Sequence, residues 1–132
     1  MIRTIGVAHL SIPVTDPERS LAFYRDVLGM KLLANVQRQG MVFLDSGGDC
    51  VILVKVDQPI STARDRNVHH SFVVAHDHYA ESVAELKRLG IAGIDEEDMR
   101  GGVVNGPRTY FHDPDGNVLE IIDLTSYKGD HV

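Results

Sequence analysis

His9-Leu10-Ser11-Ile12 is repeated later in the chain as His69-His70-Ser71-Phe72. Each copy is followed by a segment of helical character that ends in a Leu-Gly pair, Leu28-Gly29 in the first half and Leu89-Gly90 in the second. Self-similarity of this kind is the sequence signature of a duplicated structural unit. The sequence therefore predicts two copies of one module.

Each module is predicted to run from a strand into a helix and then into three further strands. Asp16 can accept hydrogen bonds at the start of the first helix, Pro17 suits its first position, and Gly29 suits a left-handed exit. The second helix is expected to begin near Asp77 and to end at Gly90. Segments of strand character cover residues 31–36, 41–45 and 49–56 in the first half, and 109–112 and 117–124 in the second.

The two modules are expected to form a single domain over residues 1–132. Residues 57–67 are polar and contain one proline, so they are predicted to connect repeats that cover about 5–56 and 68–124. Residues 125–132 lack a pattern and predict a loosely held tail. With 132 residues, the chain is long enough to bury a core without a disulfide or a structural metal.

The composition is that of an ordinary globular protein. Hydrophobic residues make up 43% and charged residues 24% of the chain, which excludes a disordered protein. The net charge of −6 and the absence of a cluster of lysines and arginines argue against a nucleic-acid partner. The longest charged run, Asp95 to Asp98, is acidic, and we interpret it as a solvated turn or helix edge.

Cysteine content and hydropathy bear on the cellular location. Cys50 is the single cysteine and cannot form an internal disulfide, which fits a reducing compartment. It stands in an apolar stretch and is interpreted as a small buried hydrophobic residue. The N-terminus lacks the apolar stretch of a signal peptide, and no apolar run reaches the roughly 20 residues of a membrane span. We therefore expect a cytoplasmic protein without a membrane partner.

In the first predicted strand, side chains alternate between two faces. His9 and Ser11 share one face, because successive side chains of a strand point in opposite directions. The other face carries apolar residues only: Ala8, Leu10, Ile12 and Val14. One such histidine is ordinarily a surface or hydrogen-bonded strand residue.

The matching strand of the second half gives His69 the equivalent place. His69 shares a face with Ser71, whereas His70 shares the opposite, core-facing side with Phe72. The matched placement indicates that His9 and His69 converge if the modules pair about a pseudo-twofold axis. No role is assigned to the remaining histidines, His76, His78, His112 and His131.

Glu120 lies inside the apolar segment from Val118 to Ile122. A carboxylate that faces an apolar interior is costly unless it is paired with a cation or metal. Alternation also permits Glu120 to face water, with its two neighbours in the core. Combined with His9 and His69, however, it completes a set of two histidines and one carboxylate, which suits Fe(II) and also Mn(II), Zn(II), Ni(II) or Co(II).

With these residues the chain resembles the vicinal oxygen chelate superfamily, which includes glyoxalases, extradiol dioxygenases, fosfomycin-resistance enzymes, methylmalonyl-CoA epimerases and bleomycin-resistance proteins. The resemblance spans nearly the whole chain. It rests on the two histidine strands, on the helix from Asp16-Pro17 through Phe23-Tyr24 to Leu28-Gly29, and most specifically on Phe111-His112-Asp113-Pro114-Asp115-Gly116-Asn117-Val118-Leu119-Glu120.

The resemblance implies an α+β fold in which two βαβββ modules form a curved mixed sheet around a metal site, the glyoxalase/bleomycin resistance/dioxygenase fold. It implies that His9, His69 and Glu120 hold one divalent metal ion, with Fe(II) or Mn(II) favoured. It also implies a small-molecule substrate that chelates the metal through adjacent oxygens.

Three further positions bear on the reaction. Aligning the final strands of the two halves matches Leu53 with Glu120. By resemblance, the glyoxalase I enzymes have a second glutamate ligand at the position of Leu53, and the epimerases have a glutamine there. Leucine cannot bind a metal ion, so this departure counts against both as the exact activity. Tyr110 resembles a tyrosine of the dioxygenases and fosfomycin enzymes and is a candidate catalytic hydrogen-bond donor. Its alternative role is packing on a cross-strand neighbour. Ser11 resembles a substrate-binding hydroxyl of the fosfomycin enzymes.

The sequence narrowly favours a metal-dependent oxygenase of the extradiol type, with Tyr110 and Glu120 as catalytic residues. The alternatives are a glyoxalase-like lyase or isomerase, a fosfomycin-type thiol transferase, and a non-catalytic ligand-binding protein resembling bleomycin-resistance proteins. The chain has no tryptophan and no recognisable potassium-binding loop, which weighs against the transferase. A homodimer is expected by analogy.

Overall fold

The computed structural model describes residues 1–60 and 66–127. The predicted connector, 57–67, and the predicted tail, 125–132, therefore lie partly outside the described residues. His131 lies outside them as well. The chain divides into two compact units, Met1–Ile60 and Ser61–Val132, and each is described by itself. No helix in the described part of the chain is long and apolar enough to cross a bilayer.

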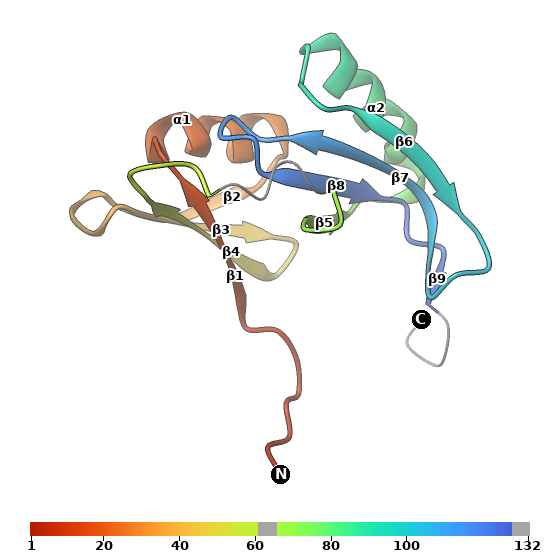
Figure 1. The fold of residues 1–132 in the computed structure, drawn as a ribbon, viewed down its shortest axis with the longest axis horizontal. Coiled ribbons are helices and arrows are strands. Elements are labelled where there is room, and N and C mark those ends of the chain that lie inside the picture. The colour runs from red at the N-terminus through yellow and green to blue at the C-terminus, as the bar shows by residue number, and fades with distance from the viewer. Residues whose placement is uncertain (61–65, 128–132) are drawn as a thin grey trace. The chain divides into compact units, whose positions relative to one another are not determined.

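The first unit is a four-stranded mixed sheet with one helix (Figure 1). Its regular elements are β1 (His9–Val14), α1 (Pro17–Ala22), β2 (Lys31–Val36), β3 (Met41–Ser46) and β4 (Asp49–Lys55). The strand order is β1-β4-β3-β2, with β1 parallel to β4 and the other neighbours antiparallel. A π-helical turn, Phe23–Val27, extends α1, and a 3-10 turn, Gln37–Gln39, joins β2 to β3.

The ends of the first helical segment follow from the residues predicted to cap it. Asp16 Oδ1 accepts a hydrogen bond from the backbone N–H of Arg19 at 3.2 Å, and Pro17 is the first helical residue. Gly29 follows the π-helical turn with a φ of +71°, a left-handed conformation that glycine adopts without steric cost. The predicted start and exit are both confirmed.

The core of the first unit lies where α1 packs on β3 and β4. Ile12 and Val14 of β1 are fully buried, whereas His9 and Ser11 are exposed, which confirms the predicted alternation. Cys50 was expected to be buried but is only partly so, because it pairs with His9 and shares its face of the sheet. The other buried apolar residues include Leu21, Tyr24, Val42, Leu44, Val51 and Leu53.

The second unit has the same succession of elements (Figure 1). They are β5 (His70–Val73), α2 (Tyr79–Arg88), β6 (Asp95–Met99), β7 (Val104–His112) and β8 (Val118–Ile122), followed by a short β9 (Ser126–Tyr127) that pairs with β7. The order β5-β8-β7-β6 reproduces that of the first sheet, again with a parallel first pair. The predicted α+β class, with a strand, a helix and three strands in each half, is confirmed.

One prediction for the second unit was wrong. The acidic run from Asp95 to Asp98 is strand β6 and neither a turn nor a helix edge. Cations from other segments compensate its charge: Lys87 of α2 contacts Glu96 at 2.8 Å, and Arg66 contacts Glu97 at 2.6 Å. The helical segment starts with a 3-10 turn, His76–His78, and continues as α2 from Tyr79, which agrees with the predicted start near Asp77.

Strand β7 passes unusually close to the chain that follows β8. The carbonyl oxygens of Asn105 and Pro107 accept hydrogen bonds from the backbone N–H groups of Thr125 and Asp123, both at 2.9 Å. Gly106 lies between them with a φ of +134°, and a Cβ atom there would stand 1.9 Å from the carbonyl oxygen of Asp123. Only a residue without a side chain allows this approach.

An ion pair between His76 and Asp123 gives the second unit a pH-dependent contact. The His76 Nδ1 atom lies 2.6 Å from Asp123 Oδ2, and this hydrogen bond, helped by the carboxylate charge, raises the pKa of His76 above its ordinary value. A raised pKa in the folded state means that the pair stabilises the fold fully below the unfolded pKa, and that this contribution is lost as pH rises through the raised pKa.

We expect an NMR titration of the His76 ring protons to give a pKa above the ordinary value of about 6.5. The substitution Asp123→Asn should return the pKa towards that value, whereas Asp77→Asn should change it little, because Asp77 makes the smallest contribution to the shift. Equal effects of the two substitutions would contradict the hydrogen bond as the cause.

Candidate metal site

The register of the second sheet brings three polar side chains onto one face. Glu120 of β8 is paired with Tyr110 of β7 on one side and with Ser71 of β5 on the other. Directly paired residues project to the same face of a sheet. The opposite face carries α2, as the hydrogen bond of 2.8 Å between the hydroxyl groups of Tyr79 and Thr109 shows. We refer to the face with Glu120 as the open face.

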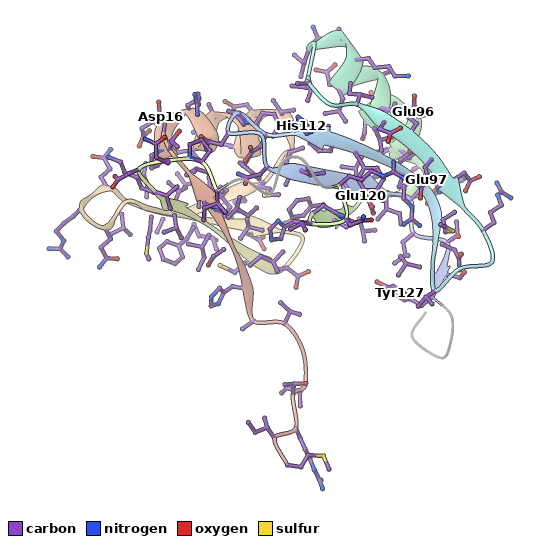
Figure 2. All side chains as sticks on the ribbon, viewed as in Figure 1. Asp16, Glu96, Glu97, His112, Glu120 and Tyr127 are labelled. Atoms are coloured by element: carbon purple, nitrogen blue, oxygen red, sulfur yellow. The ribbon has the colours of Figure 1, made fainter. Side chains whose placement is uncertain are left out.

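Glu120 of β8, labelled in Figure 2, is a buried carboxylate with one oxygen bonded and one without a partner among the described residues. Its side chain is 2% exposed. Its Oε1 atom accepts a hydrogen bond of 2.6 Å from the Ser71 hydroxyl. Its Oε2 atom accepts no hydrogen bond from the described residues and lies 3.3 Å from His69 Nε2. A buried anionic oxygen in this state is costly unless a cation compensates it.

The imidazole of His69 is oriented by a bond to the main chain. Its Nδ1 atom lies 2.6 Å from the carbonyl oxygen of Arg66. Because a carbonyl only accepts, Nδ1 must carry the hydrogen, and in the neutral ring Nε2 then keeps its lone pair. This nitrogen is the one that faces Glu120 Oε2. Orientation of a histidine through its second nitrogen is a regular feature of protein metal sites.

Tyr110 covers the other side of this pair. Its ring contacts that of His69 edge to face, with the centroids 5.2 Å apart. Burial raises the pKa of Tyr110 and the neighbouring Glu120 carboxylate raises it further, whereas contact with Arg108 lowers it in part, so the phenol stays protonated at neutral pH and can donate. The Arg66 guanidinium lies over the ring, 4.7 Å from its centroid.

Sequence reasoning missed two arginines beside these residues. Arg66 holds the segment before β5 against β6 through ion pairs with Asp95 and Glu97. Arg108 is 8% exposed, and its Nη1 atom lies 4.0 Å from Glu120 Oε2. The signal for Arg108 was present, because it stands two residues before Tyr110 in the same strand and therefore shares its face. Arg66 comes from the connector, and no periodicity pointed to it.

The predicted residues are divided between the two units. His69, Tyr110 and Glu120 lie together in the second unit. His9 and Ser11 lie at the start of β1 in the first unit, exposed on the face opposite its core. Among the described residues, no three side chains of the His, Cys, Asp and Glu types are gathered at metal-binding distance. His70 pairs with Leu119 and lies on the face opposite to Glu120, as predicted.

The register also corrects the alignment of the two halves. Ser11 of β1 pairs with Ile52, as Ser71 of β5 pairs with Glu120, so the residue equivalent to Glu120 is Ile52 and not Leu53. Leu53 is fully buried on the other face. The sequence alignment slipped by one residue, because it matched the segments without the pairing that fixes which face each residue takes. The first half still supplies no carboxylate at this position.

The donor set of the second unit fits a divalent metal ion. A carboxylate oxygen without a partner faces an imidazole nitrogen with a free lone pair, and both are donors that divalent transition metals accept. The Ser71 and Arg66 contacts hold the two side chains in place, as the outer contacts of metal ligands usually do.

Comparison with known proteins identifies the family. Residues 6–121 match the Glyoxalase/Bleomycin resistance protein/Dioxygenase superfamily. The chain therefore belongs to this superfamily, which confirms the resemblance drawn from its motifs. Members of the superfamily include metal-dependent transferases, lyases and dioxygenases.

Relatives with assigned activities differ in the reaction they catalyse. Metallothiol transferase FosB of Lysinibacillus sphaericus is 31% identical over 118 residues, which cover 87% of this chain and 79% of that protein. Lactoylglutathione lyase of Salmonella typhimurium is 28% identical over 125 residues, covering 87% and 90%. Catechol-2,3-dioxygenase of Bacillus subtilis is 31% identical over 123 residues, covering 89% of this chain but 40% of the dioxygenase.

A solved structure shows the same fold. The fosfomycin resistance protein FosX of Listeria monocytogenes, complexed with Mn(II) and sulfate, aligns with a TM-score of 0.75 over 93% of both chains. The sequence identity in this alignment is 20%.

Proposed function

We propose that this protein is a divalent-metal-dependent enzyme in which His9, His69 and Glu120 hold the ion. The observation that carries the proposal is the Oε2 atom of Glu120, which is buried, has no hydrogen-bond partner in the described part of the chain and faces His69 Nε2 at 3.3 Å. A bound divalent ion would supply a Lewis acid that polarises substrate oxygens. His9 completes the ligand set by its repeat relation to His69.

The residues around the donor pair have distinct proposed roles. Ser71 fixes the rotation of the Glu120 carboxylate through its hydrogen bond of 2.6 Å. Tyr110, kept protonated by burial, donates a hydrogen bond to a substrate oxygen on which negative charge develops. Ser11 remains the proposed substrate-binding hydroxyl of the first unit.

For the reaction we favour addition of a thiol to a small electrophile. Two of the relatives described above carry a thiol or glutathione in their names, the metallothiol transferase and the lactoylglutathione lyase. This support outweighs the narrow preference for an oxygenase that the sequence alone gives. In such an addition to an epoxide, the thiol releases its proton to solvent, the sulfur forms a bond to carbon, and the C–O bond breaks. The released oxygen takes up a proton, which we assign to donation by Tyr110, and Tyr110 is then reprotonated from solvent.

An extradiol-type oxygenase is the second candidate. Its support is the 31% identity to catechol-2,3-dioxygenase, together with a ligand set of two histidines and one carboxylate that suits Fe(II). The cytoplasmic location and the homodimer remain predictions.

The test is to purify the protein anaerobically, measure its metal content, and reconstitute it separately with Mn(II), Fe(II), Zn(II), Ni(II) and Co(II). We expect one ion per chain, and loss of free thiol that requires the metal, a small thiol and an epoxide such as fosfomycin. Oxygen uptake with a catechol and Fe(II), without thiol loss, would replace the transferase by the oxygenase. Failure of the wild type to bind any of the ions would overturn the enzyme and favour a ligand-binding protein.

A further inference from the structure

Arg108 is a buried cation for which the proposed function has no use so far. It is 8% exposed on β7, on the open face that carries Tyr110 and Glu120. Its Nη2 atom donates to the Val104 carbonyl at 2.7 Å and its Nε atom donates weakly to the Gly106 carbonyl at 3.4 Å. These two bonds anchor the guanidinium, which also interacts with the Tyr110 side chain, and its Nη1 atom lies 4.0 Å from Glu120 Oε2.

The charge around Arg108 is incompletely compensated. Glu97 is paired across the ladder with Arg108, but its carboxylate binds Arg66 at 2.6 Å. Glu120 is thus the carboxylate that both Arg108 and His69 face. If Glu120 bound a divalent ion, its single negative charge would have to balance both the ion and the Arg108 guanidinium. The buried guanidinium would then require a further anion beside it.

We propose that Arg108 is a specificity-determining residue that binds a permanently charged anionic group of the substrate, a carboxylate or a phosphonate, next to the oxygens held at the metal. This inference rests on the proposed function and narrows its substrate class to small anions. A guanidinium suits the task because its planar donors match the two oxygens of such a group and because it keeps its charge at every physiological pH. Burial strengthens the interaction by lowering the local dielectric constant.

The experiment measures binding by isothermal titration calorimetry, with protein loaded with Mn(II). Three small probes share a pair of neighbouring hydroxyl oxygens that can chelate the ion: 2,3-dihydroxypropanoate carries a carboxylate beside them, 2,3-dihydroxypropylphosphonate carries a phosphonate beside them, and propane-1,2-diol is neutral. The variants are Arg108→Met, which removes the charge, and Arg108→Gln, which removes it but can still donate to a backbone carbonyl. Arg100→Met is the matched control, because Arg100 is an exposed arginine of the same unit that pairs with Asp98.

We expect the wild type and Arg100→Met to bind at least one of the two anions about tenfold or more tightly than propane-1,2-diol. Both Arg108 variants should lose that preference while they bind Mn(II) as tightly as the wild type or more tightly, because a cation near the ion has been removed. The anion that binds more tightly identifies the head group. Circular dichroism establishes that each variant is folded, and Arg108→Gln replaces Arg108→Met if the latter is not.

Several results would overturn the assignment of Arg108. A wild type that binds Mn(II) but shows no preference for either anion would do so, and so would a preference that survives in the Arg108 variants. Weaker Mn(II) binding in these variants would make Arg108 a structural neighbour of Glu120 instead. A wild type that binds no metal ion would instead overturn the proposed function, so the two failures are distinguishable.

Discussion

Replacing Glu120 with glutamine is expected to weaken the binding of a divalent metal ion by about a hundredfold or more, because even residues that only support metal ligands usually contribute tenfold to a hundredfold. Glutamine has nearly the same shape and can still accept the hydrogen bond that Ser71 donates at 2.6 Å. The change therefore removes the negative charge of the oxygen that faces His69 and little else. Competition against a chelating dye would measure the affinity.

His70→Ala is the control for this prediction. His70 is adjacent to the proposed ligand His69 in sequence, but it pairs with Leu119 and lies on the opposite face of the sheet. Its removal should leave the metal affinity unchanged, whereas His69→Ala and His9→Ala should each weaken it strongly. A loss at His70 as large as that at His69 would show that the wrong histidine has been assigned.

Gly106→Ala is expected to produce the largest loss of stability, about 3 kcal/mol or more of unfolding free energy, because strained backbone and overpacking add at one position. A methyl group would stand 1.9 Å from the carbonyl oxygen of Asp123, and the φ of +134° is one that alanine rarely adopts. The neighbouring backbone bonds to Asp123 and Thr125 cannot lengthen without opening the end of the sheet. Urea denaturation monitored by circular dichroism would measure the change.

The matched control is Gly101→Ala. Gly101 also has a positive φ, +72°, but an added Cβ atom would meet no other atom within 4 Å. Its substitution should cost only the conformational penalty of about 1 kcal/mol. The difference between the two variants isolates the steric overlap at Gly106, and equal losses would mean that the close approach is absent in solution.

Most of the fold was predictable, because its signals are local. The capping residue Asp16, the left-handed Gly29 and the alternation in the two histidine strands act over a few residues each, and the structure confirms them. The acidic strand β6 was missed for the converse reason. Asp95 and Glu97 disfavour a strand locally, and the cation that pairs with them, Arg66, comes from a distant segment.

The candidate site was predictable only in part. The sequence allowed the Glu120 side chain to lie on either face of its sheet. Its pairing with Tyr110 and Ser71 decides between the two faces. The match of Leu53 with Glu120 failed because a strand register is a property of the pair and not of one segment. Strand alternation could have placed Arg108 on the face of Tyr110. The position of its guanidinium, however, depends on the carbonyl groups of Val104 and Gly106, which no periodic pattern encodes.

The charges of β6 also limit how copies of this protein can associate. Within the described residues, β6 is the outer strand of its sheet, with β7 as its single neighbour. An uncovered outer strand invites the same strand of another molecule to extend the sheet. Here a second β6 would bring four consecutive carboxylates, Asp95 to Asp98, against an identical set. Three cations, Arg66, Lys87 and Arg100, pair with these four carboxylates, so one negative charge is left on each strand and opposes the pairing. The charge of this edge therefore disfavours extension of the sheet through β6, and we expect a homodimer to form through another surface.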